Sequence, residues 1–138
     1  MLVLAESGSN IELVDFHRVE ELAGGELPAL FKEIYIKNNG GYPEATVVEC
    51  DECLFSLNGF NPIKFGRLPI ERLMQGYQAQ DINLKGYVPF AYDDGGNSFM
   101  LSLNKEDVGT VYLLLQDGME MERVCASFES FVSSLCVK

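Results

Sequence analysis

The chain has 138 residues, of which 21 are acidic and 10 are basic, so its formal net charge is -11. A surface of this charge repels nucleic-acid phosphates and anionic lipid headgroups, which makes nucleic acid and membrane poor partners and a basic protein a good one. Hydrophobic residues make up 47% of the chain and charged residues 22%, a globular composition that argues against intrinsic disorder.

The first five residues are apolar, but no basic residue precedes them and the run is shorter than the core of a signal peptide. No other run approaches the roughly 20 apolar residues that span a bilayer. We therefore expect a cytoplasmic protein whose four cysteines, Cys50, Cys53, Cys125 and Cys136, stay reduced.

Two amphipathic helices are predicted before residue 42. The first runs from about Asn10 to Ala23, because Ser9–Glu12 has capping-box spacing; Asp15 is a competing N-cap that would start the helix later. The second opens at Pro28 and ends in the Asn-Asn-Gly-Gly of residues 38–41. The apolar residues expected to face the core are Leu13, Phe16, Val19 and Leu22 in the first helix, and Leu30, Phe31, Ile34 and Tyr35 in the second.

From Tyr42 the apolar period changes to two. Residues 46–50 and 53–57 predict two strands joined by a turn at Asp51–Glu52, and residues 58–62 predict a loop. After Pro69, apolar residues at helical spacing predict a short middle helix that fades through residues 78–81.

The clearest strands lie in a meander formed by residues 87–92, 98–103 and 111–115. Its first turn is the Asp-Asp-Gly-Gly-Asn of residues 93–97. One face should be strongly apolar and the other small, because side chains alternate along a strand. The predicted apolar face carries Val88, Phe90, Tyr92, Phe99, Leu101 and Leu103, and the predicted small face carries Ala91, Ser98 and Ser102.

Residues 119–124 predict an edge strand, and Ser127 is the expected N-cap of a C-terminal helix. That helix presents Phe128, Phe131, Val132 and Leu135 as an apolar stripe. The pattern predicts a single α+β domain over residues 1–138. It combines a mainly antiparallel sheet of about five to six strands with two N-terminal helices, a short middle helix and a C-terminal helix.

No pattern in the chain indicates catalysis. His17 is the only histidine and is expected to face solvent on the first helix. Cys50 and Cys53 have the spacing of half a zinc site or of a redox pair, but ten residues separate Cys125 from Cys136, so these two cannot supply the other half. The 93–97 loop lacks the ligands of a calcium loop, and no glycine-rich phosphate loop occurs. We therefore expect no enzyme, no cofactor and no metal.

The order of these motifs resembles the SUKH superfamily, which includes a fungal regulator of cell-wall assembly and many bacterial proteins. The resemblance runs from about Leu13 to Leu135 and is carried by short motifs. These are Leu27-Pro28, Asn39-Gly40-Gly41, Val88-Pro89-Phe90-Ala91, Asp94-Gly95-Gly96, Gly109-Thr110-Val111-Tyr112 and residues 126–131. It implies an α+β fold and, for many bacterial members, an immunity protein that neutralises a toxin, often a nuclease. It brings no catalytic residue and no binding residue with it.

The first hypothesis is therefore an acidic inhibitor that binds a basic partner, such as a toxin domain. Its candidate contacts cluster at predicted strand ends and mix acids with aromatic anchors. They are Tyr42, Glu44, Glu49, Asp51, Glu52, Tyr92, Asp93 and Asp94.

Two other functions stay open at this point. One is a regulatory or structural interaction module of the cell-wall-regulator type with no toxin partner. The other is an enzyme of unrecognised type, which would need a polar pocket, for example around Cys53 or His17. Exposed edge strands also leave a homodimer open. The sequence names neither the partner nor the surface that binds it.

Overall fold

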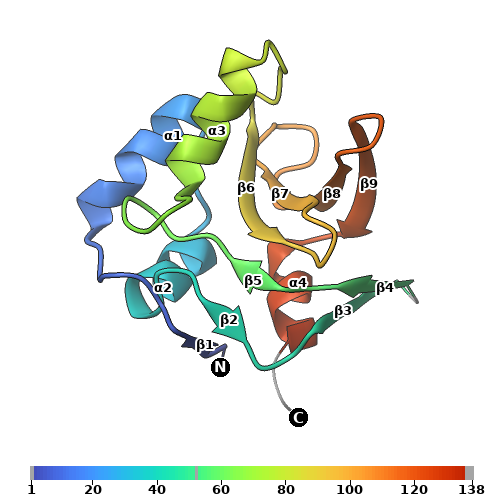
Figure 1. Ribbon diagram of the computed structural model, residues 1–138, viewed down its shortest axis with the longest axis horizontal. Helices are drawn as coiled ribbons and strands as arrows, with labels where there is room; N and C mark the ends of the chain where they lie inside the picture. The colour runs from blue at the N-terminus through green and yellow to red at the C-terminus, as the bar shows by residue number, and fades with distance from the viewer. Residues whose placement is uncertain (1, 52, 136–138) are drawn as a thin grey trace.

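A five-stranded antiparallel sheet stands at the centre of the computed structural model, which describes residues 2–51 and 53–135. In spatial order its strands are β5 (Gly59–Phe60), β6 (Tyr87–Tyr92), β7 (Ser98–Ser102), β8 (Val111–Leu115) and β9 (Glu120–Cys125). Helix α4 (Phe128–Leu135) packs against this sheet, and α1 (His17–Ala23) and α3 (Ile70–Ala79) lie side by side next to β6 (Figure 1).

The remaining elements frame this body. A 3-10 turn, η1 (Leu13–Phe16), leads into α1, and α2 (Ala29–Lys37) follows. Two small antiparallel sheets pair β1 (Leu4–Ala5) with β2 (Tyr42–Pro43), and β3 (Val47–Cys50) with β4 (Cys53–Ser56). The α+β architecture and its mainly antiparallel sheet are thus confirmed. No helix in the described part of the chain is long and apolar enough to cross a membrane.

Aromatic rings join α4 to the sheet. The ring of Phe90 on β6 lies 5.4 Å from that of Phe128 and 5.2 Å from that of Phe131, centroid to centroid. Phe99 on β7 lies 5.3 Å from Phe131. All four rings are fully buried, so the apolar stripe predicted for the last helix is confirmed as the cover of one sheet face.

The predicted faces of the meander are wrong at one point, because β6 contains a bulge. Val88 pairs with Leu101 as expected, but Ala91 lies opposite Phe99, and Tyr92 lies opposite Ser98. One extra residue in the strand has moved the side chains that follow it to the other face. Ala91 therefore belongs to the Phe99 face, and Tyr92 to the Ser98 face.

The second face of the sheet was predicted to carry only small side chains, and this prediction is wrong. Met100 and Leu114 are buried there, and Tyr77 of α3 forms a 3.4 Å hydrogen bond with Ser98. Every residue of β7 is buried, so this strand is covered on both faces.

The first helix starts later than Asn10. The backbone N–H of Glu12 donates to the carboxylate of Asp15 over 2.8 Å, so the capping box runs from Glu12 to Asp15 and not from Ser9 to Glu12. Leu13 then faces solvent, with 67% of its surface exposed, although Phe16 and Val19 are buried as expected. The bounds of α2 and α3 agree with their predictions.

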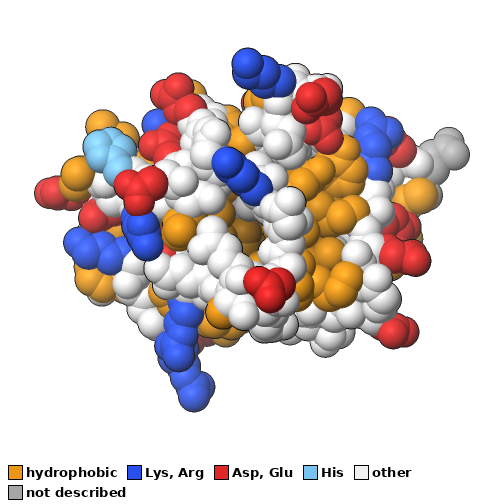
Figure 2. All heavy atoms as spheres, turned by 90° about the horizontal axis from the view of Figure 1, so that it is seen from above, with side chains coloured by type: hydrophobic (Ala, Val, Ile, Leu, Met, Phe, Trp, Pro, Cys, Tyr) orange, Lys and Arg blue, Asp and Glu red, His pale blue; other side chains and the backbone are white. Residues whose placement is uncertain are grey.

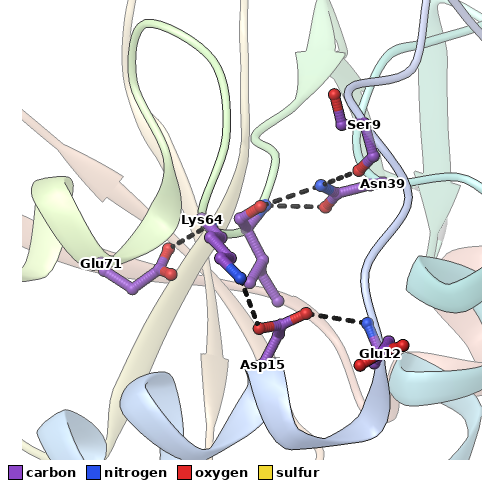
Figure 3. A network of polar contacts seen from close by, with 7 residues as sticks. Ser9, Glu12, Asp15, Asn39, Lys64 and Glu71 are labelled. Carbon is purple, nitrogen blue, oxygen red and sulfur yellow. Dashed lines mark hydrogen bonds and ion pairs between the residues drawn. The ribbon is translucent and has the colours of Figure 1, made fainter.

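Asn39, just after α2, connects its own segment to those of Ser9 and Ile63 by hydrogen bonds (Figure 3). Its amide nitrogen donates to the carbonyl oxygens of Ser9 at 2.9 Å and Ile63 at 2.8 Å, and its amide oxygen accepts from the N–H of Ile63 at 2.7 Å. Beside this network, Lys64 lies 3.1 Å from Asp15. The Glu12 N–H, and then Lys64, lower the pKa of the Asp15 carboxyl.

Gly40 extends this contact. Its φ is +76°, and a Cβ at this position would lie 2.7 Å from the backbone nitrogen of Pro62. A side chain does not fit at Gly40, so Asn39 and Gly40 together hold the end of α2 against residues 61–63.

Three structural features were not predicted. Residues 59 and 60, predicted as loop, form β5 on the edge of the sheet. The strands β1 and β2 are too short to show a period. Cys50 and Cys125 form a disulfide, which corrects the expectation that they are reduced; they are 75 residues apart, and only the fold brings β3 to β9. Cys53 is free and exposed, and Cys136 lies outside the described residues.

Candidate functional site

The predicted partner-binding residues lie in two places. Tyr42, Tyr92, Asp93 and Asp94 lie around β2 and the β6–β7 turn, whereas Glu49 and Asp51 belong to the β3–β4 hairpin. Glu44 is exposed between β2 and β3, and Glu52 lies outside the described residues. The structure therefore divides a set that the sequence treated as one patch.

Tyr42 and Tyr92 line a groove of about 490 Å³, here called the tyrosine groove. Burial, and then a hydrogen bond with Tyr42, raises the pKa of Tyr92. Gly59 makes room for this ring, because a Cβ there would lie 2.7 Å from the Tyr92 hydroxyl. The other apolar lining residues are Phe60, Pro62, Leu68 and Leu73. Sequence reasoning missed them because they come from three separate segments.

The Asp93 side chain makes its hydrogen bonds within its own turn. One carboxylate oxygen accepts from the N–H groups of Gly95 at 2.9 Å and Asn97 at 2.8 Å, and the other accepts from the Asn97 side chain at 2.9 Å. The Asp93 carboxylate therefore shapes the loop, as aspartate does in tight turns, and is a weak candidate for a partner contact.

Asp94 connects this turn to the end of β4. Its backbone N–H donates to the Ser56 hydroxyl, and its carboxylate accepts from the Asn58 side chain, both at 3.3 Å. Because the contact with Asn58 is long and exposed, the Asp94 carboxylate can exchange it for a cation of the partner.

The β3–β4 hairpin projects from the body (Figure 1) and has two unlike faces. Val48 is fully buried, on the inner face. The outer face carries Val47, 44% exposed, and Leu54, 67% exposed, with Glu49 directly opposite Leu54. We call Val47, Glu49 and Leu54 the hairpin face. The period of two in β4 predicts that Leu54 and Phe55 point in opposite directions, but it does not say which one faces outward.

Charge is unevenly distributed along the chain. No lysine or arginine occurs between Lys37 and Lys64. On the helical side, by contrast, acids meet basic residues: Arg18 pairs with Glu21 at 2.6 Å and Lys32 with Glu20 at 3.2 Å. Near the hairpin, Arg123 lies 3.8 Å from Asp51, and both side chains are more than half exposed, so this pair contributes little. The hairpin is thus acidic with little local compensation.

A second groove, of about 540 Å³, lies between α1, α3 and the sheet. It is lined by Met74, Tyr77, Tyr87, Pro89 and Met100, among others. Figure 2 shows hydrophobic side chains gathered over the strands on this side of the molecule, with side chains of both charges around them. The mixed rim gives no preference for a partner of one sign.

The residues considered for chemistry stand apart from both grooves. His17 is exposed on α1 and lines neither groove. Within residues 2–51 and 53–135, no three His, Cys, Asp or Glu side chains gather as ligands for a metal ion. The exposed Cys53 lines neither groove.

Two comparisons with known proteins complete the description of the site. The sequence model of the SMI1 / KNR4 family (SUKH-1) matches residues 10–134. A comparison with curated proteins found no match.

Proposed function

The chain belongs to the SMI1 / KNR4 family (SUKH-1), and we propose that it neutralises a basic toxin domain by direct contact. Membership of this family supports a role as an immunity protein or an SMI1/KNR4-type protein, either of which binds a protein partner. In this proposal the protein is not an enzyme, and its partner-binding surface is acidic.

The observation that carries this proposal is the hairpin face. It combines two exposed aliphatic side chains with Glu49, in a stretch without lysine or arginine. Exposed apolar groups beside an acidic side chain with little local compensation suit a surface that meets an apolar and cationic partner.

The mechanism follows from electrostatics. A nuclease presents positive charge to phosphate, and an inhibitor of net charge -11 is steered toward that region and occupies it. Exposed acids at the contact mainly raise the association rate, whereas Val47 and Leu54 supply apolar area that slows dissociation. Substrate is then excluded because the same cationic surface is covered.

Co-expression with the toxin encoded by a neighbouring gene, scored by cell survival, tests the function. Binding of the purified pair should weaken as salt rises, because the Debye length falls to about 3 Å at 1 M salt. Glu49→Lys should weaken binding by about tenfold. Glu33→Lys, a charge reversal at an exposed position of α2, is the matched control and should change little. Failure of the protein to protect any cell, or affinity independent of salt, would contradict the proposal.

The alternative is an interaction module of the cell-wall-regulator type. The same family match supports it, and an acidic binding face suits either partner. A neighbouring gene for cell-wall assembly, and a phenotype of its deletion without any toxin present, would favour this alternative.

The proposal places the protein in the cytoplasm, where a nuclease toxin acts. The Cys50–Cys125 disulfide argues against this location, because such bonds are rare in reducing compartments. Alkylation of thiols in intact cells before lysis decides the matter. Modified Cys50 and Cys125 support the cytoplasm, and protected ones an oxidising compartment.

A further inference from the structure

The β3–β4 hairpin has two strand edges that pair with no other strand of residues 2–51 and 53–135. Among the described residues, β3 and β4 form a sheet of their own with no third strand. Helix α4 packs against β3, so β4 is the strand of the hairpin farther from α4. The β6–β7 turn meets β4 at Ser56, where the Asp94 N–H donates to the Ser56 hydroxyl, and Leu54 lies nearer the tip of the hairpin. An unpaired edge presents backbone donors and acceptors to any strand that approaches it.

The register shows which residue of β4 presents these groups. Cys50 and Cys53 flank a connection of two residues, and the pair that closes such a turn is hydrogen bonded. The next pair, Glu49 and Leu54, is not, so the backbone N–H and C=O of Leu54 point away from β3. Leu54 therefore combines an outward backbone with a side chain that is 67% exposed.

Charge decides between the partners that could occupy this edge. A second copy of the chain would bring a second net charge of -11 and a second acidic hairpin to the contact, and like charges repel. A partner strand that carries lysine or arginine is attracted to this edge. The apolar stems of these side chains can cover Leu54 while their charged ends reach toward Glu49.

We infer that the β4 edge and the hairpin face bind an extended segment of the partner in which apolar and cationic side chains alternate, as an added antiparallel or parallel strand. This inference rests on the proposed function, in that the partner is a basic protein. It adds the binding surface, the mode of binding and the residue pattern that is recognised.

The test uses a labelled short peptide of alternating valine and lysine, and a second peptide with glutamate in place of lysine, measured by fluorescence anisotropy. Leu54→Pro removes the outward N–H and leaves the hydrogen bonds within the hairpin, a change that edge strands tolerate. Leu54→Ser replaces the apolar side chain by a small polar one and keeps the backbone N–H. Leu13→Ser is the matched control, because Leu13 is also 67% exposed but lies on η1.

The lysine peptide should bind the wild type at least about tenfold more tightly than the glutamate peptide, and Leu54→Pro should lower that affinity by about tenfold. Leu54→Ser should lower it less, and Leu13→Ser should not change it. Circular dichroism checks that the proline variant is folded; if it is not, the serine variant decides. Equal binding of the two peptides, or unchanged binding by both Leu54 variants, overturns the inference. A wild-type dimer that Leu54→Pro abolishes would identify a second copy as the occupant and also overturn it.

The two proposals fail in different ways. If a basic toxin domain binds the wild type and both Leu54 variants equally well, the β4 edge is the wrong surface but the function stands. If no basic toxin domain binds, yet peptide binding depends on Leu54, the edge is correct and the function is wrong.

Discussion

Replacement of Asn39 by alanine tests how much of the fold depends on a single buried side chain. Asn39 is 1% exposed and makes three hydrogen bonds, of 2.7 to 2.9 Å, with Ser9 and Ile63. A net contribution of about 1 kcal/mol for each bond gives about 3 kcal/mol, and the buried N–H and C=O of Ile63, left without partners, add about 1 kcal/mol or more. Asn39→Ala should therefore lower the free energy of unfolding by about 3 to 5 kcal/mol.

Urea unfolding followed by circular dichroism measures this loss, with Asn10→Ala, at an exposed asparagine, as the control. Asn39→Asp adds a pH signature. Burial and two facing carbonyl oxygens should raise the pKa of the new carboxyl above its unfolded value, so the folded state binds the proton more tightly. The variant then loses stability as pH rises from the unfolded to the folded pKa, and is closest to wild type below both. A loss below about 1 kcal/mol for Asn39→Ala would refute this account of the network.

Four further predictions follow from other positions in the structure. Gly59→Ala should destabilise the protein by about 1 to 3 kcal/mol, because its Cβ meets the Tyr92 hydroxyl at 2.7 Å. Gly76→Ala on α3, where nothing lies within 4 Å, should stabilise by up to about 1 kcal/mol, and thermal unfolding compares the two. Cys125→Ser should cost about 2 to 4 kcal/mol without reductant and little once the wild type is also reduced; equal stability in both conditions would contradict it. The hydrogen bond to Asp107 raises the pKa of Tyr112 to about 12, so Asp107→Asn should lower that pKa toward 10, and ultraviolet titration of the tyrosines would reveal an unchanged value.

The elements that the sequence predicted well are those whose burial repeats regularly. Helix α4 buries Phe128, Phe131 and Leu135 on one side. This helical spacing is visible in the sequence without knowledge of the elements that pack against the helix. The β6 bulge could not be predicted in the same way, because one inserted residue reverses the faces after Phe90 and leaves the composition unchanged. β5 has only two residues, and its hydrogen-bond partners, β6 and Gly41, are distant in the sequence.

The candidate site was predictable only in part. Acidic residues near Tyr42 and Tyr92 can be seen in the sequence, and the structure brings these two tyrosines together. The structure also shows that the Asp93 carboxylate accepts hydrogen bonds within its own turn. A prediction based on charge alone does not include these local bonds. The exposure of Leu54 depends on which hairpin face meets α4, a tertiary contact that alternation alone cannot determine.

The link between Cys50 and Cys125 closes a covalent ring that contains α3 and all five strands of the central sheet. A protease that cuts the exposed Asp94–Gly95 bond would leave both halves of the ring attached, so the nicked chain should migrate as one species until a reductant separates it. The ring thus allows backbone cleavage within the sheet region without physical loss of either fragment.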